Sequence, residues 1–275
     1  MDEHSRVAAD RDARPPLEAV LLDAGGVLVR LDFEWMSQTL AAMDLPVSAA
    51  ELRRAEVQGR RRYDASLGTP PAPGELPTAL GSTGDTDAYF VGTLEAAGVP
   101  PAVIPAVIER FMVRQKASGL WGRPNEGARK TLDALVRLGL RRAVVSNSDG
   151  RAERHLIDSG VRDGIELVVD SHVVGVEKPD PRIFRIALEA LGVAADRALF
   201  VGDIRSVDEA GARAAGVHFV LIDPFGDYAA PGTPAIADIG ALPDHLAAHF
   251  HIVPSAPGGA ARSAETAGGR AGGDS

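Results

Sequence analysis

The sequence predicts an α/β protein with a parallel sheet at its core and a helical domain inserted after the first strand. Two observations lead to this fold class. Short runs of Val, Ile and Leu alternate with segments of helical periodicity, which is typical of a parallel sheet wrapped by helices. One long stretch, residues 33–117, breaks the alternation, because it contains helical periods but no run typical of a strand.

Five apolar runs are the candidate strands, and each has the length and composition of a buried parallel strand. They cover residues 19–22, 142–145, 166–169, 198–201 and 218–222.

Two helices between these runs have clear boundary signals. Asn125 is a candidate N-cap for a helix over 126–138, and Asp180 with Pro181 precedes a helix over 182–191. A glycine follows each helix, as is common at a helix C-terminus.

The inserted segment has helix signals of its own. Ser48 and Glu51 have the spacing of a capping box, a Gly/Pro-rich interruption covers 68–84, Asp85 is a candidate cap, and Pro100-Pro101 leads into a helix over 102–116. Because the insertion follows the first strand, we expect it to lie over the carboxyl ends of the strands, where it can exclude water and contact a substrate.

These observations divide the chain into a core, formed by 17–32 and 118–252, and a helical domain, formed by 33–117. The ends, 1–16 and 253–275, are polar or rich in Ala, Gly and Ser, and we expect both to be disordered.

Composition excludes several classes of function. The 275 residues carry a net charge of −9, which disfavours sequence-independent binding to nucleic acid. The chain has no cysteine, so any metal is held by oxygen or imidazole ligands. No apolar run is long enough to span a membrane and the N-terminus does not resemble a signal peptide, so we expect a cytoplasmic monomer or homodimer without a membrane partner.

Polar residues follow several of the predicted strands, at the edge where parallel α/β sheets bind ligands. Asp23 follows the first strand and precedes a Gly-Gly turn, whose backbone N–H groups can approach an anion. Ser146 and Asn147 end the second run, and Asp203 ends the fourth, with Asp208 close behind. Three carboxylates at one edge form an oxygen-only site suited to Mg²⁺. Taken singly, Asp23 and Ser146 are also ordinary turn or cap residues.

Lys178 is the remaining candidate functional residue. It precedes a proline-stiffened helix start, in a chain with three lysines among 29 basic residues, so arginine is the usual cation here. A lysine at this place indicates a role that arginine cannot fill.

In this order, the residues resemble the haloacid dehalogenase-like hydrolase superfamily. Its four motifs match 23–27, Ser146, Lys178, and Gly202-Asp203 with Asp208, and the resemblance covers about residues 17–223. It implies a Rossmann-like core and identifies the helical insertion as a cap of the C1 type.

The resemblance also implies roles for these residues. Asp23 would be the nucleophile that attacks a small phosphorylated substrate, and Ser146 and Lys178 would assist catalysis. Mg²⁺ would be held by Asp23, the carbonyl of Gly25 and Asp203, with Asp208 as a further ligand or an orienter of bound water. The phosphate would be bound by residues of three motifs, namely Ala24, Gly25, Ser146, Asn147 and Lys178.

Gly25 departs from the pattern of the phosphatases in this superfamily, which have a general acid two residues after the nucleophile. Three interpretations remain: substrates with good leaving groups, a substitute acid such as Asp32 or Glu34, or a protein with little activity. The last would be a binding protein for a phosphorylated ligand or partner, and it is the alternative to a phosphatase.

Related chemistries fit less well. Dehalogenases of the superfamily lack the Gly-Asp form of the fourth motif, and phosphonatases use a cap lysine, whereas the only lysine near this cap is Lys116.

Other conspicuous residues have a structural explanation. The Arg-rich segment 60–63 either faces the substrate or forms a solvated helix face. Trp35 and Trp121 lie near the two junctions of cap and core, where packing is expected. His155 and His172 have no partner at metal-ligand spacing, and we assign neither a catalytic role.

Overall fold

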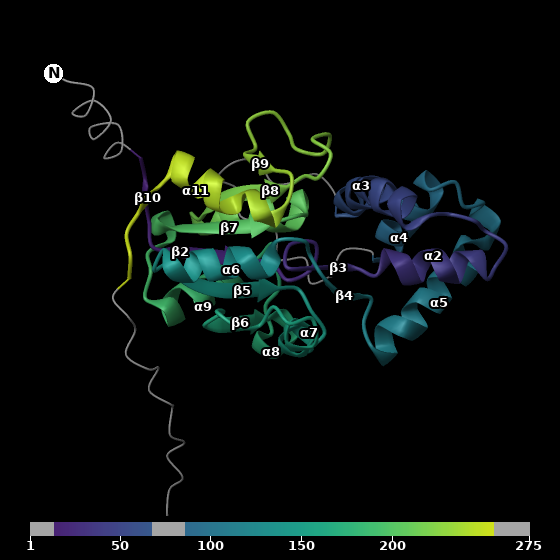
Figure 1. Cartoon of the computed structure of the whole chain (residues 1–275), viewed down its shortest axis with the longest axis horizontal. Coiled ribbons are helices and arrows are strands. Elements are labelled where there is room, and N and C mark those ends of the chain that lie inside the picture. The colour runs from purple at the N-terminus through teal and green to yellow at the C-terminus, as the bar shows by residue number, and fades with distance from the viewer. Residues whose placement is uncertain (1–13, 68–85, 256–275) are drawn as a thin grey trace, which may run out of the picture.

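The computed structural model describes residues 14–67 and 86–255 (Figure 1). Within these residues, the centre of the molecule is a six-stranded sheet in the order β6-β5-β2-β7-β8-β9, and neighbouring strands are parallel throughout. The strands are β2 (Ala19–Leu22), β5 (Arg141–Ser146), β6 (Leu167–Asp170), β7 (Ala198–Gly202), β8 (His218–Ile222) and β9 (Ala235–Ile236). The predicted α/β class is confirmed.

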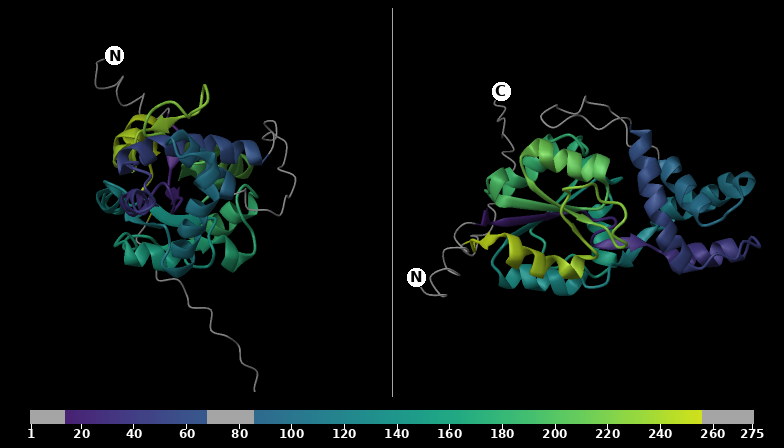
Figure 2. Two further views of the ribbon diagram at one scale, coloured as in Figure 1. Left: turned by 90° about the vertical axis from the view of Figure 1, so that its right-hand side faces the viewer. Right: turned by 90° about the horizontal axis from the view of Figure 1, so that it is seen from above.

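Helices cover both faces of the sheet (Figure 2). On one face lie α6 (Ala128–Arg137), α7 (Ala152–Asp158) and α11 (Leu242–His249), and on the other lie α9 (Arg182–Leu191) and α10 (Ala210–Ala215). All four residues of β2 are fully buried, which explains why this strand is a continuous apolar run without polar alternation.

The predicted strands agree closely with those observed. The first and the last have the predicted bounds, β5 is longer by one residue at each end, and β6 begins and ends one residue later. The two-residue edge strand β9 was not predicted, because so short a segment has no periodicity to detect.

One helix start was predicted correctly and one was wrong. The helix α9 begins after Pro181, and the Asp180 side chain accepts a hydrogen bond from the backbone N–H of Arg182. Asn125 does not cap α6, which begins at Ala128 after Gly127, a residue with a φ of 82°. The Asn125 side chain instead donates to the carbonyls of Gly26 and Val27, both at 2.9 Å.

The described part of the inserted segment consists of helices joined by short connections, and it contains no strand. Its helices are α2 (Phe33–Ala41), α3 (Ala49–Ser66), α4 (Thr86–Ala96) and α5 (Ile104–Ala117), with a 3₁₀ turn over Pro101–Val103. We call residues 33–67 and 86–117 the helical unit. It has an apolar core of its own, in which Phe90 and Phe111 are fully buried.

Two short antiparallel strands join the helical unit to the sheet. The chain leaves through β3 (Val29–Leu31) and returns through β4 (Trp121–Pro124). In Figure 1 the helical unit lies beyond the ends of β2, β5 and β7, to the right of the sheet. This is the placement expected for a domain that covers the carboxyl ends of the strands.

The capping signals of the helical unit can be checked in part. Ser48 accepts from the backbone N–H of Glu51, and the Glu51 side chain accepts from that of Ser48, so the predicted capping box is present. The predicted interruption at 68–84 and the candidate cap Asp85 lie outside the described residues. No helix in the described part of the chain combines the length and apolar character needed to cross a membrane.

Some residues at the inner ends of the two predicted disordered segments, 1–16 and 253–275, are ordered in the structure. Strand β1 (Pro16–Leu17) pairs with β10 (His251–Ile252), and the backbone N–H groups of Val253 and Ser255 donate to Leu17 and Gly139. Pro16, Val253 and Ser255, which composition predicted to be disordered, therefore have backbone partners in the core. The rest of both predicted segments lies outside the described residues.

Candidate active site

The polar residues predicted from the strand ends meet in one cavity of about 450 Å³ between the sheet and the helical unit. Asp23 follows β2, Ser146 ends β5, and Asp203 follows β7, so three neighbouring strands deliver them to the same edge. The cavity is lined by every residue of the predicted site, namely Asp23, Ala24, Gly25, Ser146, Asn147, Lys178, Asp203 and Asp208. Their individual roles stay predictions.

Lys178 joins two of the carboxylates. Its Nζ lies 3.1 Å from Asp23 Oδ2 and 2.7 Å from Asp208 Oδ1, and its side chain is 1% exposed. A buried ammonium is stable only with such partners. Burial lowers the pKa of Lys178, but the carboxylates of Asp208 and Asp23 outweigh this effect and raise the pKa above its usual value. Lys178 therefore remains a cation fixed beside Asp23.

The backbone of Lys178 is held by Asn147. The Asn147 side-chain amide donates to the carbonyl of Lys178 at 2.8 Å, and its oxygen accepts from the Lys178 backbone N–H at 2.7 Å. The side chain of Asn147 is thus occupied, and only its backbone remains for the phosphate contact predicted for this residue.

Asp208 is committed to protein donors on both oxygens. Its Oδ1 accepts from Lys178, and its Oδ2 accepts from the backbone N–H groups of Asp203 and Ile204, at 2.8 and 2.9 Å. A carboxylate bonded in this way positions the lysine and the loop after β7. Of the two roles predicted for Asp208, that of a direct metal ligand is therefore the weaker.

The acidic cluster fits a small divalent cation. Asp23, Asp203 and Asp208 each offer a ligand atom, and these atoms lie within 4.8 Å of one another. Hard cations such as Mg²⁺ are bound through one or two carboxylates. The approach of Asp203 requires glycine at position 26, because a Cβ there would lie 1.9 Å from Asp203 Oδ2. The donor set fits an ion held mainly by Asp23 and Asp203, and the glycine at position 26 is what lets the Asp203 carboxylate approach.

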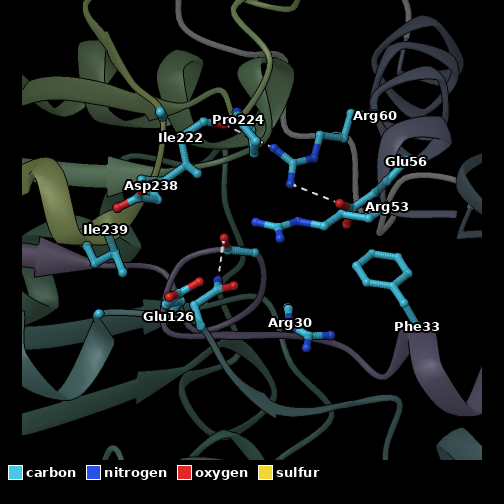
Figure 3. A pocket seen from close by; sticks show the side chains of 14 residues that line it. Arg30, Phe33, Arg53, Glu56, Arg60, Glu126, Ile222, Pro224, Asp238 and Ile239 are labelled. Carbon is cyan, nitrogen blue, oxygen red and sulfur yellow. Dashed lines mark hydrogen bonds and ion pairs between the residues drawn. The ribbon is translucent and has the colours of Figure 1, made fainter. Parts of the chain in front are cut away.

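Arg60, from the Arg-rich segment 60–63, lies beside the acidic cluster. It comes from α3 in the helical unit, is only 3% exposed, and lies 3.3 Å from Asp203 Oδ2 and 3.3 Å from Glu56 Oε2. It also donates to the carbonyl of Ile222 at 3.1 Å, and Figure 3 shows the contacts to Ile222 and Glu56. Arg60 therefore ties the helical unit to the sheet edge. Because Arg60 is buried, the predicted solvated helix face is wrong for this residue, and the alternative of a substrate contact stays a prediction.

The neighbours of Arg60 behave as the sequence suggested. Arg61 and Arg62 are exposed and bond to Asp227 and Glu95. Tyr63 lines the cavity that contains Asp23.

A second pocket, of about 230 Å³, is lined in part by the loop after β2 (Figure 3). Gly26 lines this pocket, whereas Ala24 and Gly25 line the first. Of its three arginines, Arg30 and Arg60 are paired with Glu34 and Glu56, and Arg53 is exposed with no ion pair among the described residues. Because none of the predicted site residues lines this pocket, the first cavity is the candidate active site.

Neither predicted substitute acid reaches the candidate active site. Asp32 caps α2, is paired with Arg114 and Arg123 at 2.7 and 3.1 Å, and does not line the cavity. Glu34 pairs with Arg30 on the surface, and this hydrogen bond lowers its pKa. Both carboxylates are held ionised by arginine, so neither is suited to donate a proton.

Trp121 was expected to pack between the domains, and it also lines the cavity. The indole lies against the backbone of Gly25, where an ideal Cβ would be 3.2 Å from Trp121 Cδ1. His155 lines the cavity as well, but sequence reasoning gave it no role. Trp35 packs between Phe111 and the Arg114 guanidinium, as predicted for a residue at the domain junction.

The ionisation of Asp23 gives a testable pH dependence. Burial raises the pKa of Asp23 to about 6, although Lys178 opposes the shift. Between about pH 4 and about pH 6 the folded, metal-free protein holds a proton that the unfolded chain has released, so rising pH destabilises the fold. We expect the free energy of unfolding of wild type to fall by about 1–3 kcal/mol relative to Asp23→Asn across this window. Urea unfolding of both proteins in the presence of chelator would measure this difference. Free energies of unfolding that change in parallel with pH in wild type and Asp23→Asn would contradict the prediction.

Comparisons with known proteins agree with the geometry. The family model for haloacid dehalogenase-like hydrolases matches residues 17–216. The haloacid dehalogenase-like hydrolase domain-containing protein 3 of Mus musculus is 38% identical over 130 residues, which span 47% of this chain and 52% of that protein. The phosphoglycolate phosphatase of Rhodospirillum rubrum is 31% identical over 235 residues, which span 82% of this chain and 85% of that protein.

A solved structure shows the same fold. The phosphatase structure from Thermococcus onnurineus covers 86% of this chain and 100% of its own, with a TM-score of 0.51 and 21% identity. At this identity the likeness establishes the architecture and leaves the reaction to be argued from the site.

Proposed function

Because this chain belongs to the haloacid dehalogenase-like hydrolases, we propose that it is a Mg²⁺-dependent phosphatase that acts on a small phosphorylated metabolite through Asp23. The observation that carries the proposal is the arrangement around Asp23. Its carboxylate lies in the cavity beside a buried lysine and within an oxygen-only acidic cluster. A nucleophile, a fixed cation and a cation site together are what phosphoryl transfer requires.

In the first step, a carboxylate oxygen of Asp23 forms a bond to phosphorus while the bond from phosphorus to the leaving oxygen breaks. The electron pair of that bond leaves with the oxygen, and an aspartyl-phosphate remains. In the second step, water attacks phosphorus, the bond to Asp23 breaks, and the carboxylate is regenerated as inorganic phosphate forms. The protons released by water pass to solvent.

The other residues stabilise charge in these steps. Lys178 is close enough to Asp23 to neutralise charge that develops on the transferred group. Ser146 and the backbone after β2 line the cavity where they can donate to phosphoryl oxygens. A Mg²⁺ ion bound by Asp23 and Asp203 would supply the positive charge that offsets repulsion between the carboxylate and the phosphate.

Gly25 favours a second candidate function. Without an acid at this place, the same site would bind a phosphorylated ligand or partner through Mg²⁺ with little turnover. The position of Asp23 supports the enzyme more strongly, because a carboxylate beside a buried lysine and within an acidic cluster is placed as a nucleophile for phosphoryl transfer.

Hydrolysis of acetyl phosphate, with Mg²⁺ or with chelator, tests the proposal. This substrate has a carboxylate leaving group, so it needs no general acid. We expect turnover that depends on Mg²⁺ and releases one inorganic phosphate per acetate. Folded protein that binds Mg²⁺ and inorganic phosphate but shows no turnover would favour the binding protein.

A further inference from the structure

The space of the missing acid is filled by an indole. An ideal Cβ on Gly25 would lie 3.2 Å from Cδ1 and 3.4 Å from Nε1 of Trp121, so the pyrrole edge of the ring faces the Gly25 backbone. The rings of Tyr89 and Phe90 pack against the indole, with centroids 6.4 and 6.1 Å away. Trp121 is therefore a fixed wall of the cavity at the place where a side chain of residue 25 would extend.

The polar atom of this wall is available to a ligand. Among the residues that the structure describes, none accepts a hydrogen bond from Trp121 Nε1, and Trp121 lines the same cavity as Asp23. An indole N–H is a donor only. It can stabilise negative charge on a leaving oxygen, but it is far too weak an acid to give that oxygen its proton.

This limits which bonds can break. When Asp23 attacks phosphorus, the electron pair of the breaking bond stays on the leaving oxygen, which must depart as an anion and take its proton from solvent. Phenols, enols and carboxylic acids form such anions readily, whereas sugar and alkyl alcohols do not. General acid catalysis contributes about 10²–10⁴ in rate, and alkyl phosphates would lack this contribution here.

The side chains that line the rest of the cavity favour one kind of leaving group. Apolar and aromatic side chains come from both the helical unit and the core, and they are Tyr63, Tyr89, Met112, Trp121, Ile204 and Val207. Such a surface fits a flat apolar ring better than a hydroxylated sugar. Tyr89 is held by its hydroxyl, which donates to Glu56, so its ring has a fixed position in this wall.

We propose that the substrate is an aryl phosphate, whose ring packs against Trp121 and Tyr89 and whose leaving oxygen accepts a hydrogen bond from Trp121 Nε1. The proposal rests on the phosphatase function proposed above. It assigns Trp121 as a residue that contacts the substrate and sets specificity.

Three substrates separate the two requirements. Phenyl phosphate has an acidic and aromatic leaving group, acetyl phosphate an acidic but small one, and 2-phenylethyl phosphate an aromatic group with an alkyl oxygen. We expect 2-phenylethyl phosphate to bind as well as phenyl phosphate, as a competitive inhibitor, but to be hydrolysed at least about 10²-fold more slowly. We also expect a lower KM for phenyl phosphate than for acetyl phosphate. Comparable kcat values for the phenyl and phenylethyl esters would overturn the proposal.

The variant Trp121→Phe tests the hydrogen bond, because it keeps an aromatic ring and removes the N–H. We expect kcat for phenyl phosphate to fall about 3- to 10-fold, the value of one hydrogen bond, with a smaller effect on acetyl phosphate. The dependence of kcat on leaving-group acidity should become steeper across a series of substituted phenyl phosphates. A purely structural role would slow all substrates by one factor and leave this slope unchanged. Trp35→Phe, at the other junction, is the matched control.

Binding gives a readout that does not depend on turnover. Benzylphosphonate cannot be hydrolysed, and we expect it to bind more tightly than methylphosphonate by calorimetry, with the difference lost in Trp121→Ala. Equal binding of the two phosphonates to wild type would overturn the aromatic site while leaving a phosphatase intact. If acetyl phosphate itself is not hydrolysed in an Asp23-dependent way, the phosphatase function fails, and this proposal fails with it.

Discussion

Replacement of Asp23 by asparagine is expected to lower turnover of every phosphate substrate by about 10³-fold or more, as when the covalent nucleophile of a hydrolase is removed. An amide has nearly the shape of a carboxylate, so the hydrogen bond from the Ala24 backbone N–H can be retained. What is lost is the anionic oxygen that forms the bond to phosphorus. The fold should survive, because the substitution also relieves the burial of a charge.

The covalent intermediate gives the sharper measurement. Wild type quenched in acid during turnover should gain the mass of one phosphoryl group, located on the peptide that contains Asp23, and Asp23→Asn should gain none. Asp158→Asn is the control, since Asp158 is exposed and, within the described part of the chain, pairs with Arg154 alone. A phosphorylated peptide in the Asp23 variant would assign the nucleophile to another residue.

Replacement of Arg60 by methionine is expected to destabilise the protein by about 3–5 kcal/mol. Methionine preserves much of the buried side-chain volume, so the loss is mainly electrostatic. Without the guanidinium, Glu56 and Asp203 remain buried beside one another with no cation between them. Burial already raises the pKa of Asp203 well above its usual value, and Arg60 is the group that opposes this shift most strongly.

Urea unfolding of Arg60→Met and of Arg62→Met makes the comparison. Arg62 lies on the same helix but is exposed and pairs with Glu95. Its replacement should therefore lower the free energy of unfolding by no more than about 1 kcal/mol. Saturating Mg²⁺ should narrow the gap between wild type and Arg60→Met, because an ion at Asp203 supplies the missing positive charge. Equal stability of the two variants in chelator would show that the buried ion pair contributes nothing.

The sheet and the residues of its edge could be predicted because their signals are local. A fully buried parallel strand is a run of apolar residues, so β2 and β8 had the predicted bounds. Asp23 and Asp203 follow such runs directly, and parallel strands carry their ends to one edge. The pattern that predicts the helix start, Asp180 followed by Pro181, likewise involves only neighbouring residues.

The interactions that join distant segments could not be predicted in the same way. Arg60 meets Asp203 across 143 residues, and although it shares a helix face with Leu52 and Glu56, its helix does not reveal that distant partner. Asn125 has the chemistry of an N-cap, but its amide satisfies the carbonyls of the loop after β2. The one available signal for Trp121 was Gly25, since a missing side chain leaves a space that some other group must fill.

The pairing of β3 with β4 couples the shape of the site to the position of the helical unit. Leu31 and Trp121 face one another in this ribbon, and it forms the whole covalent connection between the sheet and the helices. Because the indole stands in the ribbon and also packs against Tyr89 and Phe90 of α4, the geometry around Gly25 depends on where the helical unit lies. Contacts outside the cavity that fix this position, such as those of Arg60, therefore help to set the shape of the candidate active site.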